Sequence, residues 1–418
     1  MQQINQSLVK AIRQKFCNVE KCPISGDRIF FENAGGALTL RSALETSTKY
    51  AAIPDNQGRD NLTSNTLNSI IEKAKNDLSC LFNAHSGDFF MGESGTELLF
   101  RLIRNALLAS SSGGSIVGTS LEHPASRSAA KKWADAMDYT YLSVPHNVEM
   151  GTVEAEAYAN NISETTRVVT IVHASPVTGM GTKIREISKI VRHKAPLAFI
   201  IVDGIQHAAH GGIDIESYDI DGYVISPYKM FSRHGFGIAW VSERLRNSPH
   251  ETLDGGPSDN WELGTRDTGA YATMSDVKEY MIWLGKKITE DIDAQVQIKA
   301  AGAAIQDYEK KMTDAMLYGV DNLKGLNDFD EIEIIGGADN PSREGLVSFR
   351  YKGQPSETIV RYLNQQAIRT HTRKCDHYSS NILAPLGWDD CIRVSICHYN
   401  TVNEVKKFLS SIATYADK

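Results

Sequence analysis

Residues 198–206 read Ala-Phe-Ile-Ile-Val-Asp-Gly-Ile-Gln, and this stretch decides the fold class. An apolar run without alternating polar residues is typical of a strand that helices cover on both faces. Such strands form the parallel sheets of α/β proteins. Asp203 closes the run, and a carboxylate there is costly unless a cationic group lies beside it. The stretch therefore predicts a parallel sheet with a charged site at the carboxyl end of this strand.

Strands and helices alternate on both sides of this run. Short apolar segments are expected to be strands, and segments with apolar residues at helical spacing are expected to be helices. The expected strands are residues 88–92, 114–118, 139–144, 165–173, 198–203 and 222–226, and the expected helices are residues 97–109, 126–137 and 184–193. Helices that connect parallel strands make right-handed crossovers, so the pattern predicts an open α/β sheet.

The two ends of the chain follow different patterns. We expect an N-terminal helix up to about Cys22, a strand at 27–33 and a helix at 67–81. Helical spacing dominates from Thr268 to Tyr318. The remaining expected elements are strands at 332–335, 345–351 and 391–395 and helices at 355–366 and 402–413. We therefore predict a large domain at residues 23–288, a small C-terminal α+β domain at residues 289–418, and an N-terminal helix (residues 1–22) that packs on the small domain.

Composition restricts the class of protein. The chain has 418 residues and a net charge of −7, with acidic and basic residues interspersed, so we expect no nucleic-acid partner and no membrane partner. The first 21 residues are polar, and no run reaches the roughly 20 apolar residues that span a bilayer. Six scattered cysteines are too few for a disulfide framework in a chain of this length. These features predict a cytoplasmic protein with reduced thiols.

Two features at expected strand ends suit a planar, phosphorylated ligand. Gly95 and Thr96 open a helix, where free N–H groups, a hydroxyl and the positive end of the helix dipole can bind a phosphate. The alternative is a simple helix cap. His123, in Leu-Glu-His-Pro-Ala, can stack its flat ring on a planar ligand, although a single histidine is more often structural.

Two further strand ends carry opposite charges. Asp203 could pair with a protonated pyridine nitrogen and keep that ring an electron sink, or it could simply cap the next turn. Lys229 follows another short apolar strand, and apolar or cationic neighbours would lower its pKa and make it a nucleophilic amine. Each signal is weak alone. Together, and in chain order, they predict a cofactor with a phosphate, a pyridine ring and an aldehyde that Lys229 holds as a Schiff base.

Longer segments carry a family resemblance. Val202-Asp-Gly-Ile-Gln206, Ser226-Pro-Tyr-Lys-Met-Phe231 and Gly235-Phe-Gly-Ile-Ala239 resemble the cofactor segment of class V aminotransferases, and the likeness extends from Phe31 to Thr401. The similar branches are the cysteine desulfurase-like and isopenicillin-N-epimerase-like ones. The resemblance implies a pyridoxal 5'-phosphate enzyme of fold type I, with a mixed, mostly parallel sheet flanked by helices in the large domain and a small C-terminal α+β domain.

The resemblance also implies a role for each matching residue. Lys229 is the implied Schiff-base lysine, and the other implied cofactor contacts are Gly95, Thr96 and Ser226 (phosphate), His123 (stacking), Asp203 (ring nitrogen), Gln206 (phenolic oxygen) and Thr265 (phosphate of the neighbouring subunit). An obligate homodimer with shared sites follows from the role of Thr265. Arg393 matches the arginine that binds the substrate carboxylate, because a guanidinium fork suits that task. We also expect substrate contacts from Ala34, Gly35, Ser175 and Tyr228.

Three positions depart from the desulfurase pattern. Tyr228 replaces the usual histidine before the lysine, and Ser175 replaces an asparagine near the ring, which is more epimerase-like. Cys375 lies about one position away from the desulfurase cysteine. Nearby basic residues would favour its thiolate and a catalytic role as sulfur acceptor, but it could equally be an ordinary residue of a substrate-facing loop. His371, Cys375 and His377 are too closely spaced for a zinc site, so we expect no metal.

Several functions remain open. The preferred one is carbon–sulfur bond cleavage on a cysteine-like amino acid, in which freed Lys229 moves the α-proton and Asp203 keeps the ring cationic. Epimerase, aldolase-type or aminotransferase activity on the same fold is the alternative. A catalytically idle scaffold that binds the cofactor is a third reading, but a scaffold has no need for the carboxylate contact of Arg393. A serine hydrolase is excluded, because Gly92-Glu-Ser-Gly95 lacks the full nucleophile-elbow pattern.

Overall fold

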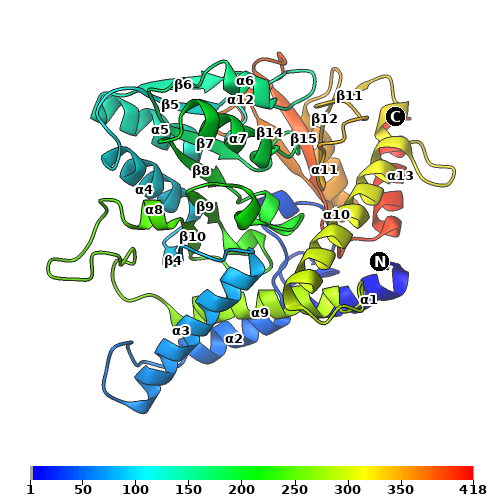
Figure 1. Cartoon of the computed structure of the whole chain (residues 1–418). Coiled ribbons are helices and arrows are strands. Elements are labelled where there is room, and N and C mark those ends of the chain that lie inside the picture. The colour runs from blue at the N-terminus through cyan, green and yellow to red at the C-terminus, as the bar shows by residue number, and fades with distance from the viewer. Residues whose placement is uncertain (1–2, 418) are drawn as a thin grey trace.

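A computed structural model describes residues 3–417 and is built around a seven-stranded sheet (Figure 1). Its strands, in spatial order, are β4 (Asp88–Gly92), β10 (Gly237–Val241), β9 (Gly222–Ile225), β8 (Phe199–Asp203), β7 (Thr166–Val172), β5 (Ser115–Thr119) and β6 (Thr140–Val144). Only β10 runs antiparallel to its neighbours. The predicted mixed, mostly parallel α/β sheet is therefore confirmed.

Helices cover both faces of this sheet, which explains the unbroken apolar run. Ile201 packs with α4 (Gly95–Leu108) and α5 (Pro124–Met137) on one face. Ile200 and Val202 belong to the core on the other face. The helices that contribute to that second core include α3 (Leu62–Leu81), α7 (Ile184–Lys194) and α9 (Thr268–Gly285). The other helices in this part of the chain are α2 (Arg41–Ala51), α6 (Ala155–Ala159) and α8 (Glu243–Arg246). The side chains of successive residues thus point to opposite faces of the sheet and are buried on both, as a sheet with helices on both faces requires.

A second, four-stranded antiparallel sheet lies in the C-terminal part of the chain. Its order is β11 (Ile332–Ile334), β12 (Leu346–Tyr351), β15 (Asp390–Ser395) and β14 (His371–Lys374). The helices in this part are α10 (Ala294–Tyr318), α11 (Ser356–Gln365), α12 (Ser380–Leu383) and α13 (Val402–Ala416). The long helix α10 lies to the right of both sheets in Figure 1 and contacts α9 and α13. The domain division at 288/289 stays a prediction.

The N-terminal segment differs from expectation in two places. The helix ends early: α1 spans Gln6–Lys15, Phe16 turns to extended backbone, and β1 (Lys21–Cys22) pairs with β2 (Gly26–Asp27). The strand expected at 27–33 is also shorter, because β3 covers only Ile29–Phe30 and a 3-10 helix follows at Asn33–Gly35. The Asn33 amide donates to the Ser395 carbonyl at 2.8 Å, and this bond draws the chain away from a straight strand.

Helix α1 contacts both parts of the protein. Arg13 donates to the Tyr399 carbonyl at 2.7 Å and pairs with Glu404 of α13 at 3.1 Å. Phe16 packs edge-on against Phe231, with ring centroids 5.4 Å apart. The segment also joins the C-terminal part through β3, which pairs in parallel with β13 (Ile368–Arg369). Across residues 3–417, helices that combine the length and the apolar character needed to cross a membrane are absent.

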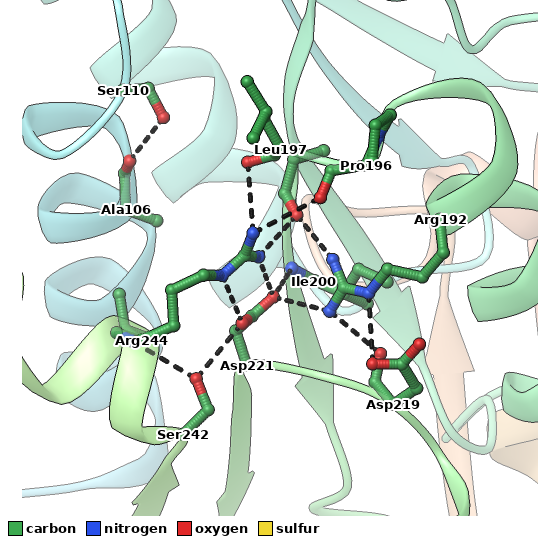
Figure 2. A network of polar contacts seen from close by, with 12 residues as sticks. Ala106, Ser110, Arg192, Pro196, Leu197, Ile200, Asp219, Asp221, Ser242 and Arg244 are labelled. Carbon is green, nitrogen blue, oxygen red and sulfur yellow. Dashed lines mark hydrogen bonds and ion pairs between the residues drawn. The ribbon is translucent and has the colours of Figure 1, made fainter.

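A buried carboxylate holds the amino ends of β8 and β9 together, opposite the edge where the site residues lie. Figure 2 shows the Arg192 and Arg244 guanidinium groups on either side of Asp221, at 3.0 and 2.7 Å. The Ile200 amide donates to the same carboxylate at 2.9 Å. Both arginines also donate to the Ala198 carbonyl at 2.7 Å. Asp221 therefore fixes the start of the strand that ends at Asp203.

Replacing Asp221 with alanine is expected to lower the free energy of unfolding by about 3 kcal/mol, because two guanidinium groups and a buried amide lose their acceptor. Chemical denaturation of the purified protein measures the loss. Asp219→Asn is the matched control: its carboxylate pairs only with Arg192, its side chain is 69% exposed, and asparagine tolerates its positive φ. The control should cost under about 0.5 kcal/mol. Equal losses in the two variants would contradict this role for Asp221.

Candidate active site

The predicted site residues come from neighbouring strand ends of the seven-stranded sheet. Asp203 ends β8, and Lys229 ends a 3-10 helix (Pro227–Lys229) directly after β9. His123 follows β5, and Gly95 opens α4 after β4. Because carboxyl ends of parallel strands meet at one edge, these four residues share that edge of the sheet.

The Lys229 amine lies in an environment that favours its neutral form. Its Nζ donates to Gln206 Oε1 at 3.3 Å. The side chain keeps some exposure, but the protein around the amine removes most of its hydration. This burial, helped by the positive charge of Arg393, lowers the pKa of Lys229 to about 7, against the opposing effect of Asp203. An amine with this pKa is nucleophilic at neutral pH.

Asp203 is a buried carboxylate in need of a cation. Its Oδ1 accepts from the Ile205 amide at 3.1 Å, and its Oδ2 accepts from Ser126 Oγ at 3.5 Å. Burial raises the pKa of Asp203 to about 6, although these two bonds and Lys229 oppose the shift. The charges of Asp203 and Lys229 act on each other, and each favours the ionised form of the other. A protonated ring nitrogen would suit this carboxylate.

The start of α4 forms a cradle of suitable shape for a phosphate. Ser94 caps the helix by accepting from the Glu97 amide at 3.1 Å. A Cβ at Gly95 would lie 2.6 Å from Ser226 Oγ and 2.6 Å from Ile205 Cδ1, so the Ser226 hydroxyl lies beside the helix N-terminus. The free amides, the hydroxyl and the helix dipole together suit an anion. The next residue, Thr96, is exposed and could add its hydroxyl.

His123 presents a neutral ring. It caps α5, with Nδ1 accepting from the Ala125 amide at 3.2 Å. Burial lowers the pKa of His123 to about 3, and Lys229 and Arg373 add to the shift. A neutral ring suits stacking on another flat ring, because it brings no charge into a site that already holds Lys229. The Tyr378 ring lies 6.0 Å from it.

The arginine expected to bind the substrate carboxylate is buried and only partly satisfied. Arg393 Nη1 donates to the Pro176 carbonyl at 2.9 Å, while its buried Nε has no partner among residues 3–417. Burial lowers the pKa of Arg393 to about 10, and Arg373 adds to that shift. Gly35 lies beside it, since a Cβ there would be 3.8 Å from Nη2. The neighbouring Ala34 amide donates to Ser395 Oγ at 2.8 Å, which fixes this turn.

Ser175 and Tyr228 hold nearby backbone in place. Ser175 Oγ accepts from the amides of Val177 and Thr178, so its oxygen stabilises the turn that carries the Pro176 carbonyl. The Tyr228 ring stacks on His234 with centroids 4.2 Å apart, and Gly36 leaves room for it. The substrate contacts expected of Ser175 and Tyr228 stay predictions.

Cys375 and Thr265 are both exposed. Cys375 directly follows β14, and its amide donates to the Asp389 carbonyl at 2.7 Å. Thr265 lies on the loop before α9, and within residues 3–417 no hydrogen bond joins it to Gly95 or Ser226. The roles predicted for these two residues remain untested by the single chain.

Three residues near the site were not predicted. Arg373 on β14 affects the pKa of Lys229, His123 and Arg393. Ser126 donates to Asp203, and its place one helical turn after His123 is a signal that could have revealed it. Arg127 donates to Asn381 Oδ1 at 3.0 Å and so connects α5 to α12. Neither Arg373 nor Arg127 has a sequence signal, because both depend on contacts between distant segments.

Comparison with known proteins agrees with this geometry. The family model described as "Aminotransferase class-V" matches residues 29–408. An aminotransferase-like protein of Gibberella zeae is 24% identical, covering 97% of each chain. A probable cysteine desulfurase of Borreliella burgdorferi is also 24% identical, covering 97% of this chain and 96% of the relative. The apo structure of a cysteine desulfurase from Thermococcus onnurineus superposes with a TM-score of 0.81 at 18% identity, covering 100% of this chain and 99% of the other.

The fold and the site together define a pyridoxal-phosphate-dependent enzyme of fold type I. The chain belongs to the class V aminotransferase family. In this cofactor, the aldehyde suits Lys229 and the ring nitrogen suits Asp203. The ring face suits His123, and the phosphate suits the cradle at the start of α4. The expected cofactor and enzyme class are thus confirmed, while each individual contact stays a prediction.

The reactivity of the cofactor-free Lys229 amine should rise with pH and reach half its maximum near pH 7, because only the neutral amine reacts. Competitive acetylation followed by mass spectrometry measures this, with exposed lysines as internal references. Asp203→Asn should lower the midpoint, since Asp203 raises the pKa of Lys229, and Arg393→Gln should raise it. A midpoint near the ordinary lysine value of 10.5 would refute the described environment.

A methyl group at Gly95 should weaken cofactor binding about tenfold while leaving the fold intact. In Gly95→Ala, the new Cβ forces the Ser226 hydroxyl and the Ile205 side chain aside, and both can move without unfolding the sheet. Loss of one charge-assisted bond to phosphate accounts for the size. Titration of the cofactor-free protein by absorbance gives the affinity. Gly212→Ala is the control, because a Cβ there meets no atom within 4 Å. Unchanged affinity in Gly95→Ala would remove the cradle from the site.

Proposed function

We propose that this enzyme cleaves the carbon–sulfur bond of a cysteine-like amino acid. The observation that carries the proposal is the juxtaposition of a Lys229 amine with a pKa of about 7, the buried Asp203 carboxylate and the incompletely paired Arg393. An amine, an acid and a guanidinium in one space suit an amino acid bound to a pyridine ring. The similarity to cysteine desulfurases supports sulfur as the leaving atom.

Each of these residues has a separate task in the proposal. Arg393 binds the substrate carboxylate and so fixes which bond of the α-carbon is weakened. Lys229, once free, removes the α-proton and can return it, which its near-neutral pKa allows. The bound cofactor supplies an electron sink for the pair of electrons left on the α-carbon. Asp203 keeps the ring nitrogen protonated, and the neutral ring of His123 covers one face.

Cys375 is the proposed sulfur acceptor. It is exposed at the end of β14, whose Arg373 acts on Lys229 and His123, so it lies on a segment next to the site. Attack of the Cys375 thiolate on the substrate sulfur breaks the carbon–sulfur bond, leaves a persulfide on Cys375 and releases alanine after protonation at carbon. Without this attack, elimination instead gives sulfide, and the remaining enamine hydrolyses to pyruvate and ammonia.

We also propose that two copies pair and share their sites, with Thr265 reaching the phosphate bound by the partner. Thr265 is exposed on its own chain, as such a contact requires. A reducing cytoplasm is the proposed compartment, and the six cysteines, all free, suit it.

With cysteine as substrate, the holoenzyme should release alanine and form a persulfide, and Cys375→Ala should lose both at least about tenfold. Mass spectrometry of the intact protein and of small products gives the measurement. Cys22→Ala is the matched control: hydrogen bonds from the Ser25 segment lower the pKa of this thiol to about 7, yet Cys22 lies on β1. Lys229→Ala should abolish all products and the visible absorption of the lysine-bound cofactor.

The products separate the alternatives. Full sulfur release by Cys375→Ala, with pyruvate and ammonia, would disprove the acceptor role and leave an elimination enzyme. Absence of any sulfur product, with racemised or transaminated amino acid instead, would overturn carbon–sulfur cleavage and favour the epimerase or aminotransferase reading.

A further inference from the structure

A line of buried polar side chains continues inward from Lys229. Gln206 Oε1 accepts from Lys229 Nζ at 3.3 Å, and Gln206 Nε2 lies 3.2 Å from His210 Nε2. His210 Nδ1 in turn lies 2.7 Å from Glu309 Oε2. Gln206, His210 and Glu309 are all buried. Glu309 belongs to α10, so the line connects the segment after β8 to this long helix.

The hydrogens along this line can run in only one direction while Gln206 faces the amine. Because Oε1 accepts from Lys229, the Gln206 NH₂ group faces His210 and must donate to its Nε2. A nitrogen that accepts carries no proton, so the single imidazole proton of His210 lies on Nδ1. That proton is donated to Glu309 Oε2, for which an ionised carboxylate is the stronger acceptor. With Glu309 ionised, the His210–Glu309 pair holds a net charge of −1 inside the protein.

A phenolic oxygen on the cofactor reverses this requirement. Such an oxygen is an acceptor when ionised, so Gln206 can only bind it through its NH₂ group. The amide oxygen then faces His210 Nε2, which must become a donor. The pair gains a donor at Nε2 by taking one proton, and this holds whether the charge rests on His210 as imidazolium or the extra proton moves on to Glu309 as a neutral carboxyl.

We propose that His210 and Glu309 are positioning residues that set the orientation of the Gln206 amide, and that the pair takes up one proton from solvent when the cofactor's phenolic oxygen binds Gln206. The inference rests on the cofactor assignment, and it adds a proton-holding pair that does not touch substrate. Uptake removes a net buried charge, so binding of the cofactor and protonation of the pair favour each other.

The charged groups around His210 are suited to the uptake of a proton by the His210–Glu309 pair. Burial disfavours its imidazolium form, but the adjacent Glu309 carboxylate outweighs burial, so the pKa of His210 is raised. Burial likewise raises the pKa of Glu309. The other titratable groups that face His210 are Glu344, which favours its positive charge, Lys229, which opposes it, and Cys397 and His398.

A cavity supplies a path for the proton that does not cross the substrate space. It has a volume of about 450 Å³, and its lining includes the buried His210 and Glu309 and the exposed Lys183 and Lys310. The cavity therefore runs from the pair to the protein surface. His207 and Glu344 line it as well and form a second hydrogen-bonded pair at 2.7 Å. That second pair makes no hydrogen bond to Gln206 among residues 3–417.

The test is the number of protons taken up when pyridoxal phosphate binds the cofactor-free protein. Calorimetry in buffers of different ionisation enthalpy gives this number from about pH 6 to about pH 9. Glu309→Gln lets neutral His210 carry its proton on Nε2, because the new amide can donate to Nδ1. The variant should therefore bind the cofactor, seen by absorbance, but take up about one proton fewer than the wild type at the pH of greatest uptake.

Glu344→Gln is the matched control. It alters the neighbouring His207 pair in the same cavity and should keep the wild-type proton uptake, with its pH of greatest uptake slightly lowered. Equal uptake in wild type and Glu309→Gln would overturn the proposal. Failure of the wild type to bind pyridoxal phosphate at all would instead overturn the cofactor assignment, so the two failures are distinguishable.

A second measurement needs no variant. Side-chain ¹⁵N spectra of the histidine-labelled wild type, with and without cofactor, should show the Nε2 of His210 changing from an acceptor to a protonated nitrogen. An Nε2 that stays unprotonated in the loaded protein would overturn the proposal even if Glu309→Gln does not fold.

Discussion

The scarcity of water around one amine is the constraint on which the active site depends. Lys229 would be a cation in solvent, yet here it lies among groups that include two guanidiniums and the Asp203 carboxylate. Burial and the positive charges of Arg393 and Arg373 together outweigh Asp203. The same lack of water raises the pKa of Asp203. The protein thus holds a lysine amine whose pKa is lowered and a carboxyl group whose pKa is raised. Such a pair of shifted groups is common in acid–base catalysis near neutral pH.

This arrangement is shared between the two sheets. Lys229 and Asp203 belong to strand ends of the seven-stranded sheet, whereas Arg393 and Arg373 come from neighbouring strands of the four-stranded one, where His371 pairs with Arg393. The charge that tunes the lysine therefore comes from a separate structural unit. Any movement of one sheet relative to the other changes the position of Arg393 and the basicity of the Lys229 amine. Contacts such as Arg127 with Asn381, which connect α5 and α12, keep that geometry fixed.

The sequence predicted the residues that end apolar strands and missed those placed by long-range pairing. Asp203 and Lys229 follow runs of apolar residues, and a strand end in an α/β sheet has a definite location. The strand at 88–92 was predicted to the residue for a similar reason. In contrast, β14 reads His-Thr-Arg-Lys, with no apolar pattern, and gave no strand signal. β10 was not predicted although Gly-Ile-Ala-Trp-Val is an apolar run typical of a buried strand, and only its antiparallel direction depends on neighbouring strands. His210 and Glu309 meet only because α10 crosses the segment after β8.

The pairing of β3 with β13 bears on the order in which parts of the chain fold. Ile29 leaves the ribosome long before its strand partner Ile368. The seven-stranded sheet is complete once Val241 has emerged, so it can form during translation. At that stage β3 still lacks its strand partner β13. Closure of this large loop is entropically costly and slow. The joining of the two sheets into one unit therefore follows formation of the seven-stranded sheet.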